Sequence, residues 1–118
     1  MPVLGVAPKG TGGNGMIKVG LLVRLDAKPG KEQEVENFLR SGLPIVQNET
    51  ETITWYAVRI GESSFGIFDT FPNDAARNTH LSGQLAAALM AKAGELLAKP
   101  PLIEKVDVIA DKPYENKK

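Results

Sequence analysis

The sequence predicts a single α+β domain in which strand, helix, strand, strand, helix and strand follow one another and form a four-stranded antiparallel sheet. Three observations support this prediction. The chain has 118 residues, which is enough for one domain and too few for two hydrophobic cores. Alternating apolar residues mark four strands, and two longer regions carry apolar residues at helical spacing. This element order is typical of the ferredoxin-like split β-α-β unit.

The first strand and the first helix are predicted at residues 17–25 and 31–49. In the strand, apolar side chains alternate with polar or small ones, which is the pattern of an extended chain with one buried face. The helical segment is amphipathic and has acidic residues in its early turns, where negative charge favours the helix dipole. Because Pro44 removes an intrahelical hydrogen bond, we expect a kink or a break near Ser41.

A β-hairpin is predicted next, with strands at 52–60 and 65–71 joined by the polar segment 61–64. Both strands are rich in β-branched and aromatic residues, which favour extended structure. A turn centred on Glu62 and Ser63 would set the register of the two strands.

This register predicts which side chains share a face. Trp55 is expected beside Phe68, and Tyr56 is expected opposite Asp69 on the other face. Both faces are mainly apolar, yet helices cover only one face of such a sheet. Burying a few hundred Å² of the other face, at about 25 cal/mol per Å², stabilises by several kcal/mol. We therefore expect a second copy of the chain to cover it, giving a homodimer.

The second helical region is predicted in two parts. Asn73 and Asp74 cap a short helix that runs to about His80, and a longer helix follows at 84–97. The last strand is predicted at 102–110.

Residues 1–15 are predicted to be a flexible glycine-rich leader and residues 112–118 a loose charged tail, which leaves 16–111 as the folded domain. The leader contains three glycines at the spacing of a dinucleotide-binding loop. That loop needs a strand before it and a helix after it, whereas here the order is inverted. We therefore expect no cofactor at this segment.

Composition argues against several function classes. Fourteen basic residues balance fourteen acidic ones, so the chain has no surplus of positive charge for nucleic acid or an anionic membrane. No segment approaches the ~20 apolar residues of a membrane span, and no signal peptide is evident, so we expect a cytoplasmic protein. One histidine and no cysteine leave no recognisable constellation of metal ligands, so we expect no metal.

Three segments carry a resemblance to a known family. They are Lys-Pro-Gly-Lys at 28–31 after the first strand, Phe-Gly-Ile-Phe-Asp-Thr-Phe at 65–71, and the segment 73–82 that contains the histidine. With the order of the elements, they make the region 19–110 resemble the antibiotic biosynthesis monooxygenase family of dimeric α/β-barrel proteins.

The resemblance implies a chain whose sheet faces the sheet of a second subunit. Characterised relatives oxidise phenolic or quinol-like substrates with molecular oxygen and use no metal or flavin. The first functional hypothesis is therefore a cofactor-independent monooxygenase acting on a small aromatic ligand. Other relatives cleave haem, and this activity is disfavoured because the first strand lacks their asparagine and His80 lies one helix too early.

The alternative hypothesis is a dimeric module that binds a small hydrophobic metabolite without changing it. This alternative rests on Phe71, which occupies the position where relatives with oxygenase activity often have tryptophan. A purely structural dimer is the third possibility, and it would require the predicted cavity to be filled by side chains.

His80 is the candidate catalytic residue. An imidazole near the end of the short helix could act as a base toward a phenol or anchor a bound ligand. The structural alternative is a histidine that binds a nearby backbone carbonyl and fixes the break between the two helices.

The candidate substrate-binding residues are Trp55, Arg59, Phe68, Thr70 and Phe71. Trp55 and Phe68 are expected to form two large walls beside a small floor, which would leave space for a ligand. Arg59 and Thr70 are expected on the same face and would supply polar contacts. The alternative is an ordinary core with an arginine at its rim.

Overall fold

The computed structural model of the protein describes residues 16–112. The predicted leader at 1–15 lies outside the described residues, and so does the predicted tail apart from Lys112. The described elements are, in chain order, β2 (Val19–Asp26), α1 (Glu32–Gln47), β3 (Thr54–Arg59), β4 (Ser64–Phe71), α2 (Asp74–Leu81), α3 (Gln84–Leu96) and β5 (Leu102–Asp107).

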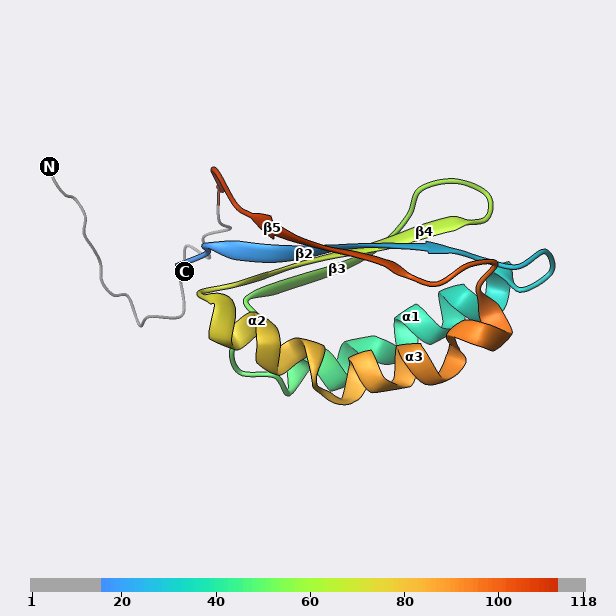
Figure 1. Cartoon of the computed structure of the whole chain (residues 1–118), viewed down its shortest axis with the longest axis horizontal. Helices are drawn as coiled ribbons and strands as arrows, with labels where there is room; N and C mark the ends of the chain where they lie inside the picture. The colour runs from blue at the N-terminus through green and yellow to red at the C-terminus, as the bar shows by residue number, and fades with distance from the viewer. Residues whose placement is uncertain (1–15, 113–118) are drawn as a thin grey trace, which may run out of the picture.

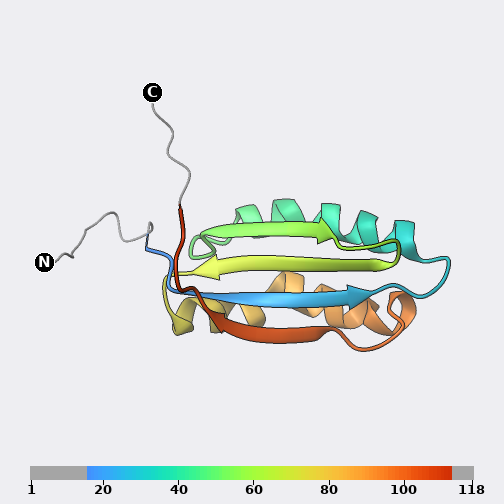
Figure 2. The same cartoon turned by 90° about the horizontal axis from the view of Figure 1, so that it is seen from above.

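The four strands form one antiparallel sheet in the order β3-β4-β2-β5. Within residues 16–112, the three helices lie on the same face of this sheet (Figure 1), and no helix of this region lies on the opposite face (Figure 2). The predicted α+β fold and its ferredoxin-like order of elements are therefore confirmed. Within one chain the sheet stays open, because β3 and β5 are edge strands.

The hydrophobic core fills the space between the sheet and the helices. The central strands β2 and β4 supply its most deeply buried members, since alternate residues of each strand point toward the helices. Leu25 and Phe71 are fully shielded from solvent, and Val35 of α1 is nearly so. The predicted cap of α2 is also confirmed, because the Asn73 side chain accepts a hydrogen bond from the backbone N–H of Ala76.

Helix α1 runs without interruption through Pro44, so the predicted break near Ser41 does not occur. Pro44 lies on the exposed side of the helix, while Leu39 and Val46 on either side of it are buried against the core. Packing of this apolar face holds the helix together where one backbone hydrogen bond is missing. No helix within residues 16–112 has the length and apolar character needed to cross a lipid bilayer.

The predicted register of the hairpin is wrong by one residue. The backbone N–H of Ile60 donates to the carbonyl of Ser64 at 2.8 Å, so Ser64 belongs to the strand and the connection has three residues. The Ser64 hydroxyl also donates to the carboxylate of Asp26 on the neighbouring strand at 2.8 Å. Because side chains alternate along a strand, a register shift of one residue moves all the side chains of one strand to the opposite face relative to its partner strand.

The observed register separates residues that were expected together. Trp55 lies opposite Asp69, and Tyr56 lies opposite Phe68. Trp55 and Asp69 consequently face the helices, while Tyr56 and Phe68 belong to the bare face. The expected pair of walls formed by Trp55 and Phe68 on one face does not exist.

The bare face of the sheet is apolar and exposed. Its residues come from all four strands, and several keep about half of their surface accessible to solvent. The exposed large side chains on it are Leu22, Tyr56, Val58, Ile60 and Leu102. The prediction that both faces of this sheet are apolar is thus confirmed.

Gly20 and Gly94 provide a test of how closely the strands pack. A Cβ atom on Gly20 would lie 2.7 Å from the backbone oxygen of Asp69, whereas a Cβ on Gly94 in helix α3 would meet nothing within 4 Å. We expect Gly20→Ala to lower the free energy of unfolding by about 1–3 kcal/mol because the sheet must shift. The same change at Gly94 should raise it by about 0.5–1 kcal/mol. Urea unfolding of both variants measures this, and equal effects would contradict the packing described.

Candidate functional site

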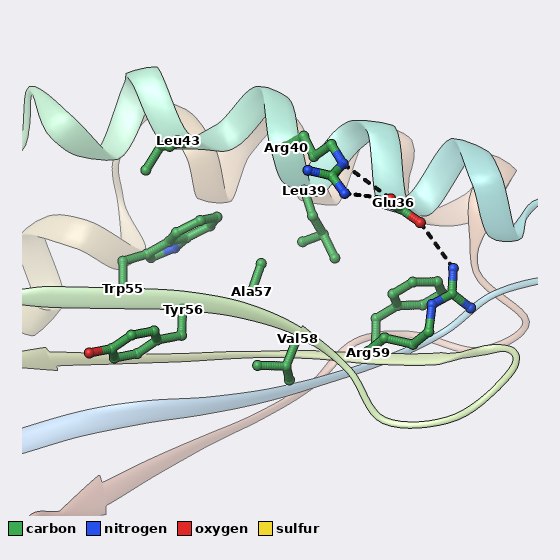
Figure 3. A pocket seen from close by; sticks show the side chains of 10 residues that line it. Glu36, Leu39, Arg40, Leu43, Trp55, Tyr56, Ala57, Val58 and Arg59 are labelled. Atoms are coloured by element: carbon green, nitrogen blue, oxygen red, sulfur yellow. Dashed lines mark hydrogen bonds and ion pairs between the residues drawn. The ribbon is translucent and has the colours of Figure 1, made fainter.

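A groove of about 630 Å³ lies between helix α1 and the edge strand β3. Figure 3 shows that Trp55, Ala57 and Arg59 point from the strand toward the helix, while Tyr56 and Val58 point away from it. The helix contributes Glu36, Leu39, Arg40 and Leu43 to the opposite wall, and Tyr56, Val58 and Phe65 also border the groove. Small Ala57 lies between two large side chains of its strand, and this leaves the middle of the groove open.

Trp55 closes one end of the groove. Its indole packs against α1 at Gly42, where a Cβ atom would lie 3.5 Å from the ring. The indole Nε1 is buried and has no hydrogen-bond partner. Trp55 is the one tryptophan in the sequence, so its fluorescence reports on this end of the groove alone.

Charged residues occupy the other end of the groove. The Arg59 guanidinium donates to Glu36 at 3.0 Å, and Arg40 binds the second oxygen of Glu36 at 2.8 Å. The hydrogen bonds from Arg40 and then from Arg59 lower the pKa of Glu36 below its ordinary value. Arg59 also lies over the ring of Phe65, with 4.6 Å from its guanidinium carbon to the ring centre. The groove therefore offers an apolar middle and a cationic group at its rim.

His80 lies in a separate, buried cluster with two carboxylates. Its Nδ1 is 2.6 Å from Oε1 of Glu49, and its Nε2 is 3.1 Å from Oδ2 of Asp69. Asp69 is 1% exposed and His80 is 8% exposed. The ring of Phe71 packs beside the imidazole at 5.3 Å between centres. The side chain of His80 thus bridges two acids and does not bind a backbone carbonyl as the structural alternative supposed.

The electrostatics of the cluster favour a protonated imidazole. Burial acts to lower the pKa of His80, but hydrogen bonds and the charges of Asp69 and Glu49 outweigh it and raise the pKa above the ordinary value of 6.5. Burial raises the pKa of Asp69, although the hydrogen bond from His80 opposes this. Both ring nitrogens of His80 are then donors, and neither has a lone pair with which to accept a proton.

Glu49 connects the cluster to solvent. Its side chain accepts a hydrogen bond from the hydroxyl of Thr52 at 2.7 Å and is one fifth exposed. Glu49 and His80 both line a second groove of about 550 Å³ that also borders Thr79 and Gly83. One end of the cluster is therefore accessible from the surface, and the other end, Asp69, is buried.

The structure places the predicted site residues in three different locations. Trp55 and Arg59 line the groove between α1 and β3. His80 and Phe71 lie together in the buried cluster. Phe68 and Thr70 belong to the bare face, where the hydroxyls of Thr70 and its cross-strand partner Thr54 are 2.6 Å apart. The single site expected from the sequence is thus divided by the sheet.

Two acidic residues of the cluster were missed by the sequence analysis as members of a site. Asp69 carries a signal that could have revealed it, because an acid in an otherwise apolar strand needs a buried partner. Glu49 carries no such signal, since it lies in a polar loop distant in sequence from His80. Among residues 16–112, no group of three or more histidine, cysteine, aspartate or glutamate side chains is arranged to hold a metal ion.

Solved structures, but no family model and no curated protein, are similar to this chain. No protein-family model matches this chain, and no curated protein matches it either. Among solved structures, a protein of unknown function from Nitrosomonas europaea, NE2512, is 50% identical, with a TM-score of 0.83 over 86% of this chain and 98% of that chain.

More distant structures share the same fold. Rv0793 from Mycobacterium tuberculosis is 14% identical, with a TM-score of 0.74 over 81% of this chain and 99% of that chain. A protein from Caulobacter crescentus named "putative antibiotic biosynthesis monooxygenase" is 20% identical, with a TM-score of 0.69 over 80% of this chain and 92% of that chain. The chain therefore belongs to the same family as NE2512 and has the fold of the antibiotic biosynthesis monooxygenases.

Proposed function

We propose that this protein is a cofactor-independent monooxygenase that binds a small phenolic or quinol-type aromatic in the groove between α1 and β3 and oxidises it with O₂. One observation carries the proposal: Trp55, which lines the apolar groove, is the cross-strand neighbour of Asp69 in the buried histidine–carboxylate cluster. An aromatic cavity thus lies next to groups that exchange protons. The fold shared with proteins named as monooxygenases supports the same activity.

The groove has the size and lining for one small aromatic molecule. A volume of about 630 Å³ is within the range of small-molecule sites. Leu39, Ala57 and Phe65 offer apolar contacts to a ring, and Trp55 is placed to stack at one end. Arg59 at the other end would stabilise negative charge on the ligand, in competition with its ion pair to Glu36.

Deprotonation of the substrate is the step that the protein would promote. A phenol loses its proton near pH 10 in water, so a neutral-pH enzyme must supply a base and stabilise the anion. His80 is favoured in its protonated form, which makes it a positioning residue and leaves the base function to a carboxylate. In this scheme the imidazolium holds Asp69 and compensates its charge in the core.

The oxidation needs no further reactant. The deprotonated quinol supplies the electrons, and the apolar walls exclude water while the electron-rich anion reacts with O₂. For a hydroquinone, one oxygen atom enters the ring and the other leaves as water. Hydroquinone plus O₂ then gives hydroxyquinone plus water, with all four electrons taken from the substrate.

A second copy of the chain is the proposed cover of the bare face. Leu22, Val58 and Leu102 expose about half of their side chains there, and a self-complementary pairing of two such faces would bury them. This would complete the dimeric α/β barrel expected from the sequence. The groove opens on the helical side of the sheet, so the pairing would leave it accessible.

The second candidate function is binding without turnover, as in a dimeric module for a small hydrophobic metabolite. The observation that favours it is the location of His80 outside the groove, because no imidazole lines the cavity that holds the ring. Oxygen consumption separates the two functions.

The first prediction concerns oxygen uptake. Purified metal-free protein should consume O₂ with some members of a panel of hydroquinones and anthrones, with one atom of ¹⁸O₂ recovered in the product. Ala57→Leu fills the groove and should reduce the rate at least tenfold, since misplacing a substrate by about 1 Å can cost a factor near 100. The same change at exposed Ala91 in α3 is the matched control and should leave the rate unchanged. Absence of uptake above the protein-free autoxidation rate, for the whole panel, would refute the proposal.

The second prediction concerns the oligomer. Sedimentation at micromolar concentration should give a dimer, and Leu22→Glu should produce a monomer because it would bury two charges in the paired sheets. Met90 is equally exposed but lies on helix α3, so Met90→Glu should remain dimeric. A folded monomer at these concentrations without any substitution would contradict the pairing.

The third prediction concerns pH. Because the folded pKa of His80 is raised, the folded chain retains a proton that the unfolded chain loses above about pH 6.5. The contribution of His80 to stability is therefore complete at pH 5.5 and decreases as the pH rises through the folded pKa. His80→Gln should cost about 3 kcal/mol at pH 5.5 and less at pH 9, measured by urea unfolding. A loss that grows with pH would show that His80 is neutral in the folded protein.

A further inference from the structure

Three buried polar side-chain atoms within residues 16–112 lack hydrogen-bond partners. Arg77 Nε belongs to a guanidinium whose other two nitrogens are bonded, and the remaining two atoms belong to the neighbouring strands β3 and β4. One is the indole Nε1 of Trp55, which is a donor, and the other is the carboxylate Oδ1 of Asp69, which is an acceptor. A folded protein rarely keeps such groups unpaired in its interior, because each has lost its bonds to water without replacement. A pair of them therefore indicates a position meant for another polar group.

The two unpaired atoms belong to neighbouring residues. Trp55 and Asp69 are directly opposed in the β3–β4 ladder. Opposed residues of antiparallel strands carry their Cβ atoms about 4.5–5.5 Å apart on the same face. A hydroxyl group is the one simple group that can bond to both kinds of atom, because its oxygen accepts from an indole N–H while its hydrogen is donated to a carboxylate.

We propose that Trp55 Nε1 and Asp69 Oδ1 form a seat for the hydroxyl group of an aromatic ligand in the α1–β3 groove, with Asp69 as the acceptor of its proton. The ligand class rests on the proposed function. Trp55 lines the groove and also carries one of the two unpaired atoms, so a ring stacked on its indole would place a hydroxyl at the seat. Nε1 is closed off from solvent, so the hydroxyl enters when the indole shifts on its edge strand.

Asp69 is suited to accept this proton. Its Oδ2 is engaged by His80 Nε2 at 3.1 Å, which leaves Oδ1 as the free oxygen. When the proton moves, the O–H bond of the ligand breaks, the electron pair stays on the ligand as a phenolate, and Asp69 becomes a neutral acid. Burial raises the pKa of Asp69 and so favours this transfer. Within the described residues, the titratable groups that act on Asp69 are His80 of α2 and Glu49 of the loop between α1 and β3.

The test compares ligands that differ only at the hydroxyl. 2-Naphthol carries the group, 2-methylnaphthalene lacks it, and 2-methoxynaphthalene has an oxygen that accepts but cannot donate. Calorimetry gives Kd for each ligand with the full chain and with Trp55→Phe, which keeps an aromatic ring and deletes the N–H donor. Thr54→Val is the matched control, because it deletes one hydroxyl from the residue before Trp55 on the same strand, and Thr54 pairs with Thr70 on the bare face and does not line the groove.

We expect Trp55→Phe to weaken the binding of 2-naphthol, relative to that of 2-methylnaphthalene, by about tenfold. This is the usual effect of one lost hydrogen bond to a buried group. Thr54→Val should leave that ratio unchanged, and 2-methoxynaphthalene should bind less tightly than 2-naphthol. If the ratio of the Kd values of 2-naphthol and 2-methylnaphthalene is the same in the unchanged chain and in Trp55→Phe, the proposed hydroxyl seat is wrong. A crystal structure of the complex in which an ordered water, and not the ligand hydroxyl, bridges the two atoms also contradicts the proposal.

Proton transfer has its own readout. The ultraviolet spectrum of naphthol shifts on ionisation, and we expect bound 2-naphthol to ionise at a lower pH than free 2-naphthol. Asp69→Asn should abolish this difference. If that variant does not fold, the pH titration of 2-naphthol bound to the unchanged chain is the test. A bound naphthol that titrates as it does in water would refute Asp69 as the acceptor.

These binding measurements are independent of turnover. If the naphthol contrast is found and no quinol consumes oxygen, the monooxygenase proposal fails and the hydroxyl seat remains. If oxygen is consumed but the contrast is absent, the seat fails and the activity remains.

Discussion

The pairing of β3 with β4 determines what each face of this molecule can do. A strand alternates its side chains between two faces, so the hydrogen bond between Ile60 and Ser64 assigns every residue of the hairpin at once. Trp55 faces the helices and Tyr56 faces away from them only in this register. A hairpin paired one residue differently would expose Trp55 or turn Asp69 outward. The groove, the buried cluster and the bare face all follow from this one constraint.

The buried cluster is the feature of this register with the largest cost in desolvation free energy. A carboxylate that is 1% exposed loses nearly all its hydration, and burial of an unpaired charge costs several kcal/mol. His80 compensates this loss, and Glu49 in turn stabilises the charge on His80. The three groups together still carry an excess of negative charge when the imidazole is protonated. Apolar residues at such positions are often as stabilising as a buried ion pair or more so, and the retention of three ionisable groups supports the role proposed for the cluster.

Much of the fold could be predicted from the sequence, whereas the site could not. Strong periodic patterns define the elements, and the ends of β2 and α1 agree with prediction to within two residues. The hairpin faces were wrong because Ser64 was counted in the turn, although it bonds to Asp26 of the neighbouring strand. The partnership of Glu49 with His80 joins residues 31 positions apart through a loop without regular structure, and no local pattern encodes such a contact.

Under the proposed function, one face of the sheet serves chemistry and the other serves association, and the two roles have different sequence requirements. Side chains that point toward α1 and side chains that point away from it alternate along β3, as Trp55 and Tyr56 illustrate. A substitution at one position can therefore alter ligand binding without touching the other face, even though the two side chains are covalent neighbours. The exception is the backbone itself. Gly20 lies on the bare-face side of β2, where an added Cβ atom would meet the backbone oxygen of Asp69 at 2.7 Å, so a side chain there would push β2 and β4 apart. The close approach of β2 to β4 at this glycine therefore requires a residue without a side chain, and it constrains the strand that carries the buried acid whichever residues line either face.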